Sequence, residues 1–154
     1  MDIFQGNKKL EEVTFAGLNH ALWNRYNQAE PFALFMLLHQ GENMKIVRLF
    51  VGGDPNVAFA NSLEKATETY DQIVCCMEGR IEHEGKKQDA IFVKVFDSSH
   101  EKGLMFSQRF RGIESGQSFK KLGNPALISM DEPCLLYTSP SPRDATLSRM
   151  PSSA

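Results

Sequence analysis

The sequence predicts an α+β fold with a five-stranded, mostly antiparallel sheet and two helices packed on it. Two observations lead to this class: two segments carry apolar residues at helical spacing, and five short apolar runs are separated by turn residues. The expected element order is α-β-β-α-β-β-β, with short connections that favour hairpins. All of these elements fall within residues 1–133, a length typical of one domain.

The first part of the chain predicts a helix followed by a β-hairpin. Leu10 to Tyr26 has one apolar face, and the helix must end before Pro31, because proline disfavours helical geometry in the preceding residue. Phe32 to His39 is a run of large apolar residues, typical of a strand buried on both faces. A Gln-Gly-Glu-Asn turn then leads into a second strand over Met44 to Val51.

A second helix is expected after the Gly52-Gly53 break, because Asp54 and Pro55 suit a helix N-terminus. Its apolar stripe consists of Phe59, Leu63, Ala66 and Tyr70.

Three further strands are expected over Ile73 to Met77, Asp89 to Phe96 and Leu104 to Arg111. The first of them is predicted to continue to Glu84 past a kink at Gly79. The residues after Gly112 predict loop and turn with one short element of undetermined type.

This element order resembles that of roadblock-type and profilin-like domains. The resemblance covers the order of elements from Leu10 to Arg111 and no diagnostic residues. It implies the spatial strand order 2-1-5-4-3, with the strand Phe32 to His39 inside the sheet.

The first, third and fourth predicted strands are apolar on both faces. Two helices on one face would leave much of the other exposed, and monomers rarely leave a large apolar patch open. The cover is expected from a C-terminal segment, a second copy of the chain or another partner. A distribution of the helices over both faces would remove this need.

Residues 134–154 have a different character. Cys134 to Asp144 reads CLLYTSPSPRD, and Ser148 to Ala154 reads SRMPSSA. Back-translated, the two blocks resemble the two fixed ends of a transposase-type sequencing adapter, and the residues between them match the length of a sample index. We therefore expect this stretch to be a translated adapter without ordered structure, and the native domain to be truncated after Pro133.

The charge balance argues against several kinds of partner. The chain carries 17 Lys and Arg against 19 Asp and Glu, a net charge of −2. No basic region favours nucleic acid or an anionic membrane. The N-terminus lacks the apolar core of a signal peptide, and no run reaches the ~20 apolar residues of a membrane span. Cys75 and Cys76 are adjacent, which precludes an ordinary disulfide, so we expect a cytoplasmic protein.

No catalytic residue, metal site or cofactor is predicted. Cys75 and Cys76 are candidates for a thiol nucleophile, but neighbouring strand residues point to opposite faces, and packing in the core is favoured. Asp54 would repel an anion at the helix start, which favours an N-cap. The four histidines lack metal-ligand spacing: His20, His39, His83 and His100.

The strongest candidate for ligand binding is the set Arg80, Asp89, Arg109 and Arg111, which flanks three consecutive strands. Asp89 is expected to pair with Arg80 across a hairpin or with Arg109 on the next strand. Two converging arginines can bind a carboxylate or phosphate. A cross-strand ion pair at the margin of the sheet is the favoured interpretation.

Together these features predict a non-enzymatic protein-interaction or assembly module that associates with itself as a homodimer or with another protein. The alternatives are a small-molecule or anion-binding domain that uses the arginines, and a cysteine-dependent enzyme. Trp23, Tyr26 and Tyr70 end the two helices and suit an interface and a core equally well.

Overall fold

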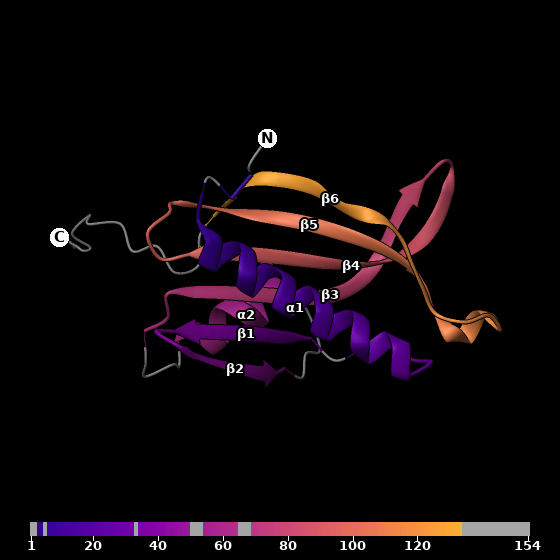
Figure 1. Ribbon diagram of the computed structural model, residues 1–154, viewed down its shortest axis with the longest axis horizontal. Coiled ribbons are helices and arrows are strands. Elements are labelled where there is room, and N and C mark those ends of the chain that lie inside the picture. The colour runs from indigo at the N-terminus through magenta and orange to yellow at the C-terminus, as the bar shows by residue number, and fades with distance from the viewer. Residues whose placement is uncertain (1–2, 5, 33, 50–53, 65–68, 134–154) are drawn as a thin grey trace.

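The computed structural model describes residues 3–4, 6–32, 34–49, 54–64 and 69–133, and the predicted adapter at 134–154 lies outside them. In these residues one antiparallel sheet has the strand order β2-β1-β3-β4-β5-β6 (Figure 1). The elements in chain order are α1 (Lys8–Asn27), β1 (Phe35–Gln40), β2 (Asn43–Arg48), α2 (Pro55–Glu64), β3 (Gln72–His83), β4 (Lys86–Asp97), β5 (Lys102–Arg111), a short 3-10 helix (Ile113–Ser115) and β6 (Lys120–Pro133). The α+β class with an antiparallel sheet is confirmed.

Helix α1 forms where its apolar spacing predicts it. The Asn7 side chain caps the helix by accepting a hydrogen bond from the Leu10 N–H, and the chain becomes extended at Gln28, before Pro31. The buried face of α1 packs on β1, β3 and β4. A Cβ at Gly17 would lie 2.7 Å from Val74 Cγ1, so the glycine allows the helix to approach β3 closely.

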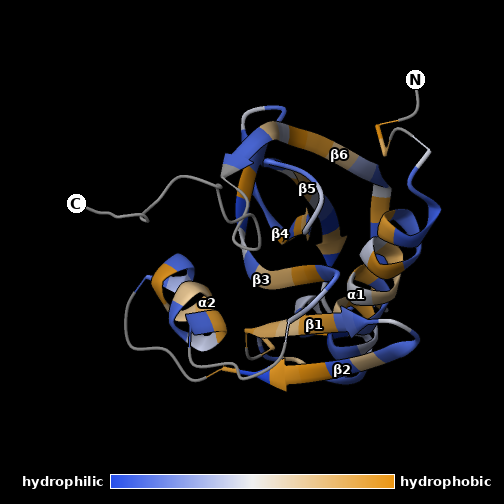
Figure 2. Cartoon of the chain, turned by 90° about the vertical axis from the view of Figure 1, so that its left-hand side faces the viewer, coloured by the Kyte–Doolittle hydropathy of each residue, from blue (hydrophilic) through white to orange (hydrophobic). Residues whose placement is uncertain are grey.

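The two helices cover opposite faces of the sheet (Figure 2). The α1 side contains Phe35, Leu37, Val74 and Val93 in one apolar cluster. The α2 side contains a second cluster: Met36, Leu38, Phe59, Tyr70, Ile73, Cys75 and Phe96. The central strands are apolar on both faces because each face has its own helix, which is the distribution that removes the need for an external cover.

The described residues form six strands, where the sequence predicts five. The additional strand, β6, follows the 3-10 helix in the segment that predicts loop and turn. Its pairing with β5 contains register shifts, and Gly123 has a φ of +73°. These irregularities break the alternation by which a strand is recognised in a sequence. Strand β3 continues past Gly79 to His83, as expected, and its register with β4 runs without interruption. The Phe92 ring fills the space beside the glycine.

The strand order 2-1-5-4-3 implied by the resemblance to roadblock-type and profilin-like domains is wrong. Strand β3 pairs directly with β1, with Phe35 opposite Cys76, and β3 to β6 form a meander. The chain leaves β2, crosses one face as α2 and returns along the free edge of β1. Each later strand then joins the previous one through a short connection, which keeps sequential strands adjacent.

A chain of buried polar groups joins one end of the sheet to the start of α1. Asp97 Oδ2 accepts hydrogen bonds of 2.8 Å from both Asn7 Nδ2 and Gln72 Nε2. Gln72 Oε1 lies 2.7 Å from Nδ1 of the buried His39. Burial raises the pKa of the Asp97 carboxyl, but hydrogen bonds from Ser99, Gln72 and Asn7 outweigh burial and lower that pKa to about 2.

We predict that Asp97 makes the protein sensitive to acid. Because the folded pKa lies below the ordinary value of 3.8, the stabilisation is present above that value and is lost as the pH falls towards 2. Asp97→Asn should cost about 1–2 kcal/mol at neutral pH and flatten the pH dependence between about pH 5 and about pH 2. Urea unfolding measures both effects.

Glu101→Gln is the matched control, because Glu101 is exposed at the same end of the sheet. The control should keep the wild-type pH dependence. If Asp97→Asn also kept it, Asp97 would not be the group that links folding to protonation.

Candidate functional site

The predicted arginine set does not converge on one face. Arg80 and Asp89 lie opposite each other on β3 and β4 and form an ion pair of 3.3 Å, one of the two pairings expected. Arg109 lies opposite Ala90, so its side chain is on the other face from Asp89. Arg111 shares the face of Arg109, two residues further along β5. A single anion therefore cannot contact both halves of the set.

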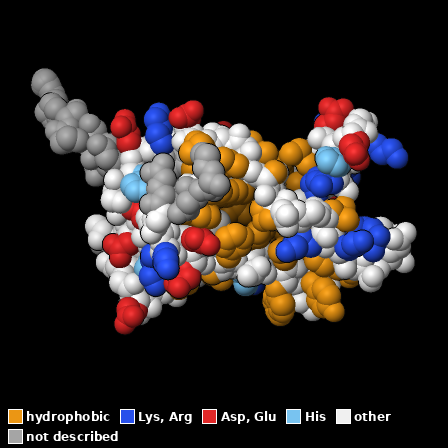
Figure 3. All heavy atoms as spheres, turned by 45° about the horizontal axis from the view of Figure 1, so that its top comes forward, with side chains coloured by type: hydrophobic (Ala, Val, Ile, Leu, Met, Phe, Trp, Pro, Cys, Tyr) orange, Lys and Arg blue, Asp and Glu red, His pale blue; other side chains and the backbone are white. Residues whose placement is uncertain are grey.

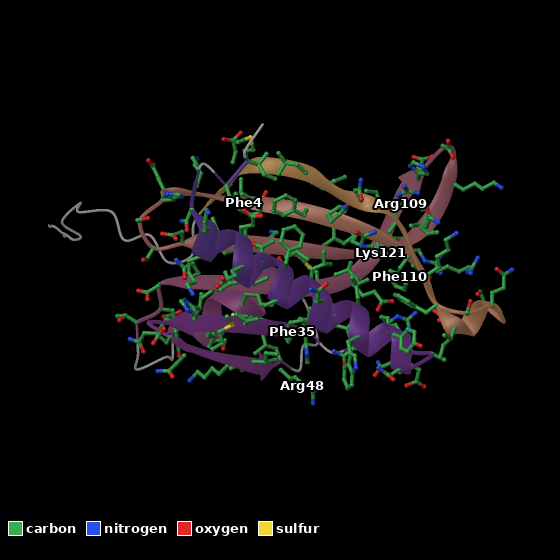
Figure 4. The ribbon with its side chains drawn as sticks, in the orientation of Figure 1. Phe4, Phe35, Arg48, Arg109, Phe110 and Lys121 are labelled. Atoms are coloured by element: carbon green, nitrogen blue, oxygen red, sulfur yellow. The ribbon has the colours of Figure 1, made fainter. Side chains whose placement is uncertain are left out.

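The arginines on the α2 face are already hydrogen-bonded. Arg109 Nη1 donates to Gln88 Oε1 at 3.0 Å, and Arg111 Nη2 donates to the Ser118 carbonyl oxygen at 3.0 Å. Figure 4 shows Arg109 and Phe110 as neighbours in sequence on β5, with Lys121 on the adjacent strand. These contacts favour a structural role at the margin of the sheet.

The other half of the set borders a shallow hollow that is rich in carboxylates. It is lined by Pro31, Glu78, Gly79, Arg80, Asp89 and Glu114. Three carboxyl groups against one exposed guanidinium oppose the binding of an anion. In the part of the chain that the structure describes, no group of three His, Cys, Asp or Glu side chains is arranged to hold a metal ion.

Next to this hollow lies a buried cation that sequence reasoning missed. Arg25, in the last turn of α1, is fully buried, and its Nε lies 3.1 Å from Glu78 Oε1. A second carboxylate, that of Glu114, pairs with the same guanidinium. The guanidinium also lies over the Phe110 ring, 5.1 Å from its centroid, and donates to the Gln28 carbonyl oxygen at 3.1 Å. The signal was present in the sequence, since Arg25 follows Leu18 and Ala21 at helical spacing on the apolar face.

Burial and charge act against each other at Glu78. Burial raises the pKa of the Glu78 carboxyl, and Arg25 only partly offsets this rise. Burial also raises the pKa of Glu114, but hydrogen bonds from its own backbone N–H and from Arg25 lower it overall. The two carboxylates neutralise a guanidinium that is itself fully buried, so the ion pairs anchor the end of α1.

The remaining candidates from the sequence occupy structural positions. Cys75 and Cys76 are fully buried on opposite faces, and burial raises the pKa of both thiols, which opposes a nucleophilic role. The Asp54 side chain accepts a hydrogen bond from the Asn56 N–H at 2.9 Å, as an N-cap does. Gly52 and Gly53 lie outside the described residues.

The histidines and aromatic residues singled out in the sequence lie in different environments. His39 belongs to the hydrogen-bonded network around Asp97. The His20 ring stacks on Trp23, and the pKa of His20 is lowered mainly by burial and further by the positive charge of Arg48. Trp23 and Tyr26 are 61% and 63% exposed on α1, whereas Tyr70 is buried against the α2 face. The first helix therefore carries the aromatic residues that suit an interface.

Exposed apolar side chains also lie on the β6 edge of the sheet. Leu127, Ile128 and Met130 are exposed by 37%, 46% and 37% on the outermost strand. Lys120 and Lys121 stand exposed at one end of β6, and Asp131 stands exposed at the other end. An exposed apolar edge strand presents both side chains and unpaired backbone groups to a neighbour.

A scan against protein-family models and searches of curated proteins and of solved structures gave no match. Within the described residues, no helix has the length and apolar character needed to cross a membrane.

We predict that Arg25→Leu destabilises the protein by about 3–5 kcal/mol, because it leaves the carboxylate of Glu78 buried without a cation. Arg25→Leu combined with Glu78→Gln should recover part of this loss, since the unpaired charge is removed. Urea unfolding at neutral pH measures all variants.

Arg80→Leu provides the matched control, because it breaks an ion pair whose guanidinium is 70% exposed. It should cost no more than about 1 kcal/mol. Equal losses for Arg25→Leu and Arg80→Leu would show that the buried ion pairs do not hold α1 on the sheet.

Proposed function

We propose that this protein is a non-enzymatic association module that forms a homodimer through the β6 edge. The single observation that carries the proposal is the exposure of Leu127, Ile128 and Met130 along an outer strand. The helices already cover the central strands, so the edge is where further apolar burial is to be gained. Cys75 and Cys76, the free cysteines among the described residues, support a cytoplasmic location, where thiols remain reduced.

The charges on β6 support a second copy as the partner. A two-fold axis at Ala126 would pair two β6 strands antiparallel. In that register Lys121 of each copy faces Asp131 of the other, whereas Glu132 is already paired with Lys94 of its own chain at 3.0 Å. Opposite charges at the two ends and apolar residues between them make the edge complementary to itself.

The opposite edge of the sheet is less suited to this role. Strand β2 has only six residues, and its charged side chains include Lys45 and Arg48. Figure 4 shows Arg48 projecting from this edge. Short strands with positive charges are a common protection against edge pairing.

Strand β6 itself does not favour an uninterrupted backbone ladder. Pro125 lacks an N–H, and Gly123 adopts a positive φ. Side-chain contacts and end charges are therefore expected to supply most of the affinity. Such a dimer would be reversible and sensitive to salt, because its ion pairs are exposed.

We predict that Lys121→Glu weakens the dimer about tenfold or more, since two symmetric attractions become repulsions. Lys121→Glu combined with Asp131→Lys should restore dimerisation, because the exchanged charges meet again across the two-fold axis. The two positions are about 33 Å apart along one strand, so the rescue cannot arise within one chain. Analytical ultracentrifugation over a concentration series measures the dissociation constant.

Trp23→Ala on α1 is the control for a dimer through a different surface. It should leave the dissociation constant unchanged. A strictly monomeric wild-type protein, or a dimer lost in Trp23→Ala and insensitive to the charge exchange, would refute an interface at β6.

A further inference from the structure

A hollow lies between α1 and the β5–β6 pair, and its lining includes none of the exposed residues Leu127, Ile128 and Met130. Its walls include Ile3, Phe4, Phe15, Leu18, Phe106 and Pro125, and its volume is about 110 Å³. Figure 3 shows hydrophobic side chains gathered in a hollow on this side of the molecule. The Phe4 ring stacks on Phe106 at 5.7 Å and is tilted against Phe15 at 6.4 Å. The walls are therefore mostly apolar, with three phenylalanine rings among them.

One polar group in the lining lacks a partner. Gln108 is 1% exposed, and its Oε1 has no hydrogen-bond partner among the described residues. A buried amide oxygen without a donor is costly, and native structures rarely leave one. A ligand or water that donates a hydrogen bond would satisfy it.

The orientation of this amide is fixed by the backbone around it. Gln108 Nε2 donates to the carbonyl oxygens of Arg109, Leu122 and Gly123 at 2.9, 3.2 and 3.1 Å. Rotation of the amide would place Oε1 against three carbonyl oxygens. The acceptor is thus held by β5 and β6 as a preorganised group of the hollow.

The chemistry of the hollow restricts the class of ligand. Its lining side chains include no charged residue, which disfavours an ion. The Thr14 hydroxyl in the lining already donates to the Leu10 carbonyl oxygen at 2.7 Å, so it leaves acceptor capacity only. A cavity of about this size in a protein core accepts a single benzene ring. The fit is to one aromatic ring with a hydrogen-bond donor.

We propose that this hollow binds a small neutral aromatic molecule carrying one O–H or N–H donor, which donates to Gln108 Oε1 while its ring packs against Phe4, Phe15 and Phe106. The inference does not depend on the proposed dimer. Phenol is the probe, and toluene is its matched control, because toluene has a similar shape and no donor.

The experiment titrates the full-length protein with each probe and follows binding by calorimetry and by NMR. Wild type should bind phenol roughly three- to tenfold more tightly than toluene, the range of one hydrogen bond. Gln108→Leu should abolish this preference and keep toluene binding, whereas Gln117→Leu, at an exposed position, should leave the preference intact.

A second readout uses wild type alone, since Gln108→Leu also removes the bonds to β6 and can fail to fold. Nuclear Overhauser effects from phenol should reach Leu18 and Phe106. The proposal would be overturned by equal affinities for phenol and toluene or by phenol contacts elsewhere on the protein. It would also be overturned if neither probe bound and only a water molecule met Gln108.

Discussion

The central constraint on this fold is that β1, β3 and β4 carry apolar side chains on both faces, so both faces must be covered. Helix α1 covers one face and α2 covers the other. The close contact at Gly17 and the burial of Arg25 both follow from seating α1 directly on the sheet. A cation enclosed in this way requires Glu78 and Glu114 beside it, because an unpaired buried charge is strongly destabilising.

Covering both faces changes where association is expected. The sequence places the need for a partner on an open sheet face, and that face is occupied by α2 over the central strands. The β6 edge stays open, with Leu127, Ile128 and Met130 exposed. The proposal of an interaction module therefore depends on an edge strand, and the hollow beside Gln108 offers a separate site for a small molecule.

The sequence predicts the elements better than their arrangement. Helical spacing places α1 to within a few residues, and turn residues place the first two hairpins. Strand β6 could not be predicted because bulges and Gly123 interrupt the alternation of its side chains. The strand order could not be predicted because periodicity does not say which strands are neighbours. Arg80 and Asp89 form one of the two expected ion pairs. The sheet face on which Arg109 and Arg111 lie depends on the register between β4 and β5, which the sequence does not show. Arg25 was visible on the apolar face of its helix, whereas the unpaired oxygen of Gln108 depends on contacts with β6 that no local pattern encodes.

Cys75 and Cys76 provide the most direct measurement of the two-sided cover, because neighbouring thiols report on opposite faces. Two variants with a single native cysteine, both carrying Cys134→Ser, would be labelled with a thiol reagent in buffer and in urea. The fold described here predicts that both thiols react at least about a hundredfold more slowly in buffer. Protection of Cys76 together with labelling of Cys75 at its unfolded rate would show that α2 does not cover the second face, and would contradict the fold and the functional proposal built on it.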